Sequence, residues 1–160
     1  MRLLPDDALW FQQPISENPV ARSIHTLTIP SSTRYLEKVR DFIETHAVEA
    51  AFSEQAVEQL KIAVDEACTN VIEHAYKGQS EHPIDIAIII KPDRFTVRIR
   101  DEGVQFNPAG YHEPNLVEFA QRRKAGGFGV HIMRRLMDSV EYRKRGKVNE
   151  CRLTKYRDEA

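Results

Sequence analysis

Polar side chains with a four-residue spacing stand out in the stretch from Val64 to Gly78, VDEACTNVIEHAYKG. Glu66, Asn70 and His74 lie one helical turn apart in it, while their neighbours are largely apolar. An amide oxygen suits Mg²⁺, which prefers hard oxygen ligands, and a carboxylate one turn earlier is placed to act as a general base. A solvated helix face would carry the same pattern, so the stretch alone leaves both interpretations open. His74 either packs at the helix end or takes part in the chemistry.

A second candidate is the stretch IRDEGVQF, in which Asp101 ends a predicted strand and Gly103 follows two residues later. A carboxylate there can accept a hydrogen bond from an exocyclic amine such as that of adenine, and a glycine lets a flat ring approach the backbone. The alternative is an ordinary Asp-Glu-Gly turn without a ligand.

Three glycines, Gly126, Gly127 and Gly129, precede a predicted helix in the third stretch, KAGGFGVHIMRRLMD. Exposed N–H groups and the helix dipole make such a helix start favourable for phosphate, although a loop with glycine hinges is the alternative. The stretch does not follow the P-loop pattern GxxxxGKS/T, and no strand immediately precedes it as in a dinucleotide-binding fingerprint. The protein-kinase motif set is also absent from the sequence.

The hydrophobic pattern predicts the elements that would position these three stretches. Residues 24–29 alternate as a strand, Ser31 or Ser32 caps a first helix, and a second helix runs from Ser53 to Gly78. DIAIIIK and FTVRIR form a hairpin through a type I turn, and SVEYRKRG and NECRLTKY form another near Gly146. Between the hairpins come a long connection over 104–127, with a short helix around 116–122, and a helix whose buried face carries Val130, Met133, Leu136 and Met137.

This order predicts an α+β fold, a two-layer sandwich with a mixed, mostly antiparallel sheet and helices packed on one face. We expect one domain over residues 23–158, preceded by an N-terminal extension over residues 1–22. The net charge of −1 offers no basic surplus for direct nucleic-acid binding, and no apolar run approaches the length of a membrane span. Cys68 and Cys151 show no metal-ligand spacing, which favours reduced thiols in a cytoplasmic protein without zinc.

Taken together and in this order, the three stretches resemble the motifs of the GHKL ATPases. DEACTNVIEHAY is similar to their N box, DEGVQFNP to their first glycine box and GGFGVHIMRRLMD to their second. The compact length and the ending NECRLTK are most similar to bacterial anti-sigma factors that are also serine/threonine protein kinases. The resemblance spans about residues 23–157 and implies a Bergerat-type ATP-binding fold.

The resemblance also implies roles for individual residues. Glu66 matches the general base and Asn70 the Mg²⁺ ligand, so the expected cofactors are ATP and Mg²⁺. Asp101 matches the reader of the adenine amine and Gly103 the glycine beneath the ring. The phosphate-binding turn is matched by a larger group: Gly127, Gly129 and the first amides of the Val130 helix, with Gly126 in the same hinge and Lys124 as a phosphate contact.

The implied function is that of a switch kinase that regulates transcription. Its partners would be an antagonist protein, which accepts phosphate on serine or threonine, and a sigma factor, which is sequestered; the family is often homodimeric. Two alternatives stay open: a module that binds nucleotide and partner without phosphotransfer, and a detached histidine-kinase catalytic domain. The chain departs from the family pattern at Gln105, which replaces a second glycine, and around Asn149 and Glu150, which replace a threonine.

Overall fold

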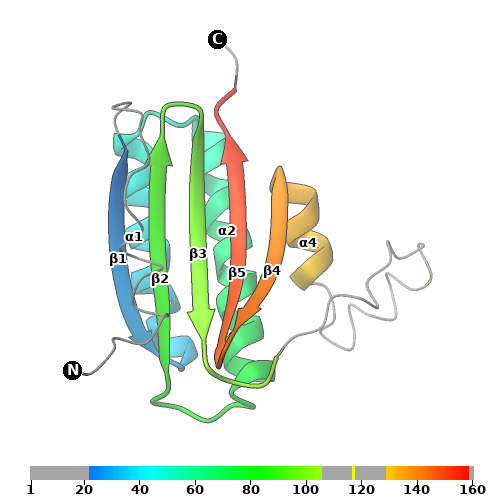
Figure 1. The fold of residues 1–160 in the computed structure, drawn as a ribbon. Helices are drawn as coiled ribbons and strands as arrows, with labels where there is room; N and C mark the ends of the chain where they lie inside the picture. Colours follow the sequence, from blue (N-terminus) through cyan, green and yellow to red (C-terminus); the bar gives the residue numbers. More distant parts are fainter. Residues whose placement is uncertain (1–21, 106–116, 118–128, 159–160) are drawn as a thin grey trace.

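The computed structural model of the chain describes residues 22–105, 117 and 129–158. They form a two-layer α+β sandwich in which helices cover one face of a five-stranded sheet, which confirms the predicted fold class (Figure 1). Most of the predicted N-terminal extension and of the predicted helix around 116–122 lies outside the described residues. The elements are β1 (Ser23–Pro30), η2 (Thr33–Tyr35), α1 (Leu36–Glu49), α2 (Glu54–Asn70), η3 (Val71–Ala75), β2 (Pro83–Lys91), β3 (Arg94–Asp101), α4 (Gly129–Leu136), β4 (Ser139–Arg145) and β5 (Val148–Tyr156).

The sheet has the strand order β1-β2-β3-β5-β4, and all four pairings are antiparallel. The prediction of a mixed sheet is therefore wrong in detail. The connection through α4 does make β4 run parallel to β3, but β5 lies between the two strands and pairs with both. Both predicted hairpins are present, and Gly146 turns the second one with a φ of 58°, which glycine adopts without strain.

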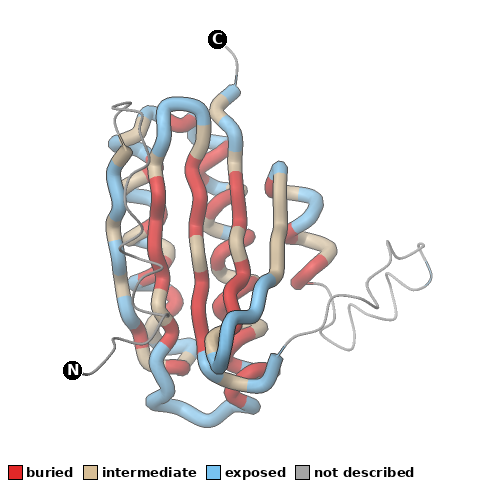
Figure 2. The backbone as a smooth tube through the Cα atoms, viewed as in Figure 1, coloured by how far each residue is buried: buried red, intermediate tan, exposed pale blue. Residues whose placement is uncertain are grey.

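Alternating side chains on the strands build the core between the sheet and the helices. Phe95, Val97 and Ile99 on β3 are fully buried and belong to one cluster with Leu60 and Val64 of α2. Figure 2 shows this burial concentrated along β2, β3 and β5, with exposed residues at the turns. On α4 the predicted apolar face is buried at Val130 and Met133, and Met137 just beyond the helix is also buried, whereas Leu136 is only half-buried.

The α2 helix begins where the sequence predicts, because the Ser53 side chain accepts a hydrogen bond from the Ala56 backbone N–H at 3.1 Å. It does not continue as one α-helix to Gly78. Residues Val71–Ala75 form a π-helical turn, closed by the Tyr76 N–H donating to the Val71 carbonyl at 2.9 Å. Such turns often mark functional sites, and this one lies at the end of the polar stripe. In residues 22–105, 117 and 129–158 no helix is long and apolar enough to cross a membrane.

The sheet face opposite the helices carries a buried ion-pair cluster. Arg100 and Glu150 stand opposite each other on β3 and β5, with Nε and Oε2 2.8 Å apart and side-chain exposures of 4% and 0%. Arg152 contacts the other oxygen of Glu150 at 3.0 Å. Burial, and then the charge of Arg152, lowers the pKa of nearby Arg98 to about 10. The cluster joins the two central strands whose ends carry the candidate site.

Candidate functional site

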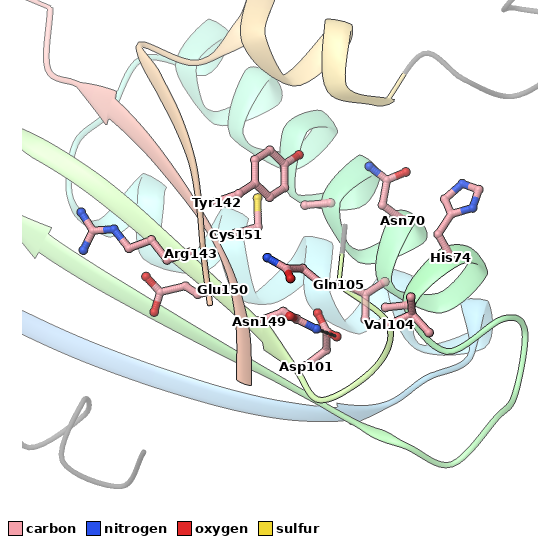
Figure 3. Close-up of a pocket in the computed structure, with 13 residues that line it drawn as sticks. Asn70, His74, Asp101, Val104, Gln105, Tyr142, Arg143, Asn149, Glu150 and Cys151 are labelled. Atoms are coloured by element: carbon pink, nitrogen blue, oxygen red, sulfur yellow. Dashed lines mark hydrogen bonds between the residues drawn. The ribbon is translucent and has the colours of Figure 1, made fainter. Parts of the chain in front are cut away.

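A cavity of about 390 Å³ lies between the C-terminal part of α2, the π-turn, and the ends of β3, β4 and β5. Figure 3 shows Asp101 and Asn149 close together on the sheet side, with Asn70 and His74 on the helix across from them. Volumes of this order are usual for small-molecule sites. The lining residues are Ala67, Asn70, Val71, His74, Ala75, Asp101, Val104, Gln105, Tyr142, Arg143, Asn149, Glu150 and Cys151.

The sheet side of the cavity is built on a register pair. Asp101 on β3 stands opposite Asn149 on β5, and Asn149 Nδ2 donates to Asp101 Oδ1 at 2.9 Å. The Gly103 N–H donates to the same oxygen at 2.9 Å. Burial raises the pKa of Asp101, although the Asn149 and Gly103 hydrogen bonds oppose that rise. The other carboxylate oxygen, Oδ2, receives no hydrogen bond from the described residues.

Close packing of the loop after β3 against the π-turn explains why a glycine is needed at 103. A methyl group on Gly103 would collide with the carbonyl of Ala75 and would lie 2.9 Å from the Ala75 Cβ. Next to it, the Val104 N–H donates to the Ala75 carbonyl at 2.8 Å. Tyr76 also connects the end of the π-turn to the strands, since its hydroxyl donates to the Pro83 carbonyl at 2.8 Å and accepts from the Glu102 N–H at 2.9 Å.

The helix side brings two predicted stretches together. The start of α4 packs directly on the polar stripe of α2, so that a Cβ on Gly129 would lie 3.0 Å from Glu66 Oε2 and 3.1 Å from both amide atoms of Asn70. Neither the Glu66 nor the Asn70 side chain takes part in a hydrogen bond or ion pair within the described ranges. A carboxylate and an amide with unused oxygens thus face the N-terminus of a helix.

The surroundings of Glu66 favour the protonated form of its carboxyl group. It is half-buried, and burial raises its pKa, with the negative charges of Asp65 and Glu73 raising it further. Asp65 is itself paired with Arg40 at 2.7 Å, which leaves Glu66 as the carboxylate directed to α4. A carboxylate with a raised pKa and no cationic partner among the described residues is a candidate functional group.

The structure describes only some of the residues predicted to contact phosphate. Val130 lies in the first turn of α4 and is buried in the core, whereas Lys124, Gly126 and Gly127 lie outside the described residues. Gln105, noted as a departure from the motif, lines the cavity.

Sequence reasoning missed other contributors. Tyr76, which holds the Glu102 backbone, carried no signal beyond its place after the helix. Tyr142 and Cys151 line the cavity from β4 and β5, and burial raises the pKa of Cys151 to about 12, so its thiol stays neutral.

Comparison with known proteins agrees with this geometry. Residues 29–155 match the family model described as a histidine kinase-like ATPase domain. A serine-protein kinase RsbW of Listeria monocytogenes serotype 4a is 35% identical over 122 residues, covering 72% of this chain and 76% of the relative. The Bacillus subtilis serine-protein kinase RsbW is 30% identical over 136 residues, covering 81% and 83%.

A solved structure of the RsbU and RsbW domains of a Mycobacterium tuberculosis protein is similar in fold. Its TM-score is 0.61 at 14% identity, and the match covers 84% of this chain and 32% of that one. At this identity the likeness concerns the fold alone.

Proposed function

Because this chain belongs to the histidine kinase-like ATPase family, and within it to the RsbW serine-protein kinases, we propose that it is an ATP-dependent serine/threonine protein kinase acting as an anti-sigma factor. The observation that carries the proposal is the meeting of Glu66 and Asn70 with Gly129 at the start of α4. That arrangement supports the proposal, because a carboxylate, an amide oxygen and a helix N-terminus at one point could serve as base, metal ligand and phosphate contact in phosphoryl transfer.

The side chains around the cavity fit a magnesium–nucleotide complex. Asp101 Oδ2 would accept from the adenine amine, and Gly103 holds the neighbouring Asp101 Oδ1 through its N–H. The amide oxygen of Asn70 would hold Mg²⁺, which supplies positive charge to the phosphates. We also assign Gly126, Gly127, Gly129, the Val130 amide and Lys124 to the phosphates, on the motif alone for the residues outside the described ranges.

In the proposed reaction, the hydroxyl oxygen of a serine or threonine attacks the γ-phosphorus of ATP as the bond to the ADP oxygen breaks. Glu66 accepts the hydroxyl proton, and its raised pKa brings it closer to the acidity useful to a base near neutral pH. The N–H groups at the start of α4 stabilise the charge on the transferred group. Most of the acceleration in such transfers comes from positioning and electrostatics.

The proposed partners are an antagonist protein that carries the accepting hydroxyl and a sigma factor that the kinase sequesters. A new phosphate carries a charge of about −1.5 to −2 and can release a partner from a shared surface. We further propose a homodimer, which light scattering at several protein concentrations would test.

Phosphotransfer is tested by incubating the chain with the antagonist and γ-labelled ATP. We expect acid-stable label on the antagonist, loss of that label in Glu66→Gln, and ATP affinity close to that of the wild type in this variant. Glu54→Gln is the matched control, because Glu54 is an exposed carboxylate at the opposite end of α2.

Two results would favour the rival functions. Complex formation without label transfer would indicate a module that binds nucleotide and partner without phosphotransfer. Acid-labile label on a partner histidine would indicate a histidine-kinase type of activity. Full transfer by Glu66→Gln would show that another group takes the proton.

A further inference from the structure

The outer face of the sheet, which points away from the helices, is buried at its centre although no described helix or strand covers it. The helices of the described part of the chain all lie on the other face (Figure 1). Side chains alternate along a strand, so Ala87 and Ile89, which flank the core residue Ile88, belong to the outer face. They are only 1% and 5% exposed, whereas the open face of an antiparallel sheet is commonly in contact with water.

The side chains beside Ile89 on the sheet are too short or too exposed to explain its burial. Its cross-strand partners are Ile24 on β1 and Thr96 on β3, and Thr154 on β5 follows next across the sheet. Both threonines are short and are themselves buried, while Ile24 is 41% exposed. Lys91, the next outward residue of β2, is exposed. The centre of this face therefore needs a cover from outside the described residues.

The outer face also carries a surplus of positive charge. Six charged side chains lie together on it: Arg22, Arg98, Arg100, Arg152, Asp85 and Glu150. Burial lowers the pKa of Arg98 to about 10, and the neighbouring arginines act in the same direction. The Nε atom of Arg22 is buried and has no hydrogen-bond partner among the described residues. Buried cations are stable when carboxylates pair with them, so the cover of this face should be acidic.

Residues 1–21 are the part of the chain best placed to supply this cover. They lead directly into Arg22, and a segment of this length can extend over up to about 70 Å. The face from β1 to β5 is only about 14 Å wide, because neighbouring strands lie about 4.8 Å apart. The connection between Gln105 and Gly129 has its two ends at the cavity and against α2, on the other side of the sheet.

The composition of residues 1–21 matches the chemistry of the face. Their charged side chains are three carboxylates and one arginine: Asp6, Asp7, Glu17 and Arg2. Carboxylates form strong charge-assisted hydrogen bonds with guanidinium groups, which suits them to the four arginines. The same segment contains Trp10 and Phe11, whose large apolar rings can cover Ala87 and Ile89.

We propose that residues 1–21 fold back over the outer face of the sheet, with their carboxylates against the four arginines and their apolar side chains over Ala87 and Ile89. The segment is thus a built-in competitor for any other acidic segment that approaches this face. Because it is tethered to β1, its effective concentration there is about millimolar, and a second copy or an acidic partner would have to displace it. The inference goes beyond the proposed kinase function and does not depend on it.

The fluorescence of Trp10, the only tryptophan of the sequence, tests the inference in the whole chain. Compared with a free peptide of residues 1–21, the wild type should emit at a shorter wavelength and be quenched less by acrylamide. Reversing the charge of the segment in Asp6→Lys/Asp7→Lys should shift both values to those of the peptide. Each reversal removes a charge-assisted bond worth about 10-fold or more in the ratio of docked to released segment.

Variants in the folded part of the chain locate the contact. Arg98→Glu should also release Trp10, and combining it with Asp6→Lys/Asp7→Lys should restore part of the shielding. Glu37→Lys/Asp41→Lys is the matched control, because it reverses two exposed carboxylates on α1, on the other side of the sheet, and should leave Trp10 shielded. Asp6→Lys/Asp7→Lys changes no residue of the sheet, so it decides the inference even if Arg98→Glu does not fold.

Three results would contradict the inference. Emission of Trp10 equal to that of the peptide at every protein concentration would leave the face to an acidic partner. Shielding that is lost on dilution would show that a second copy provides the cover. Shielding that persists in Asp6→Lys/Asp7→Lys would show that these carboxylates do not hold the segment on the arginines. None of these measurements involves phosphotransfer, so the kinase proposal stands or falls separately.

Discussion

Replacing Gly103 by alanine tests how tightly the loop after β3 is held against the π-turn η3. The added methyl group would collide with the Ala75 carbonyl, which is backbone and cannot rotate away. Gly103 has no left-handed φ, so alanine is compatible with the backbone conformation and the effect is steric. Separating the two segments would also break the Val104-to-Ala75 hydrogen bond.

The expected cost follows from these two contributions. Overpacking of this kind costs about 1–3 kcal/mol and the lost hydrogen bond about 1 kcal/mol, giving about 2–4 kcal/mol together. For a chain of this size that corresponds to a fall in Tm of about 4–16 °C. Thermal unfolding followed by circular dichroism measures it, and calorimetry should show weaker ATP binding, because Gly103 also donates to Asp101.

Gly129→Ala is the matched control for the fold. The three atoms nearest to its methyl group would all belong to the side chains of Glu66 and Asn70, which can turn aside, so Tm should stay the same or rise while phosphotransfer falls. A fall in Tm of less than about 2 °C for Gly103→Ala, with unchanged ATP affinity, would refute the close packing of loop and π-turn.

Three further predictions follow from charges in the structure. Glu66→Gln should raise Tm at pH 7, because the raised pKa of Glu66 means that its ionised form destabilises the folded state at pH values above that pKa. Below about pH 4 the variant should have the same Tm as the wild type, because Glu66 is then protonated in the folded and in the unfolded state. The affinity for ATP, measured by calorimetry, should fall as the pH is lowered, because a protonated Asp101 is a weaker hydrogen-bond acceptor. Burial raises the pKa of Asp101, so the fall should begin at a pH above the ordinary aspartate pKa of about 3.9. Glu150→Ala should lower the free energy of unfolding in urea by about 3–5 kcal/mol, since it removes the buried carboxylate that Arg100 and Arg152 both contact. Glu141→Ala, which breaks an exposed pair, should cost less than about 1 kcal/mol.

The sequence was sufficient where local patterns determine structure. Alternation in β3, the Ser53 cap and the turn at Gly146 are all local signals, and the structure has each of them. The polar stripe of Glu66 and Asn70 was also predictable from the sequence, because residues four positions apart lie on the same face of a helix.

What the sequence could not provide depends on long-range pairing. Asn149 meets Asp101 only because β5 inserts between β3 and β4, and no local pattern encodes that strand order. The π-turn was missed for a related reason. Its Ala75 carbonyl accepts a hydrogen bond from the Val104 N–H, which lies beyond the following hairpin, so one contact of this turn depends on a distant segment.

The register between β3 and β5 makes the proposed adenine-binding site depend on correct folding. Because β3 stays paired with β2, a slip of β5 by one residue would turn Asn149 to the opposite face and bring the charged Glu150 toward the interior, so that Asp101 would lose its hydrogen bond from Asn149. Retention on an immobilised adenine resin should therefore sort refolded molecules, with natively aligned chains held and misaligned ones washed through.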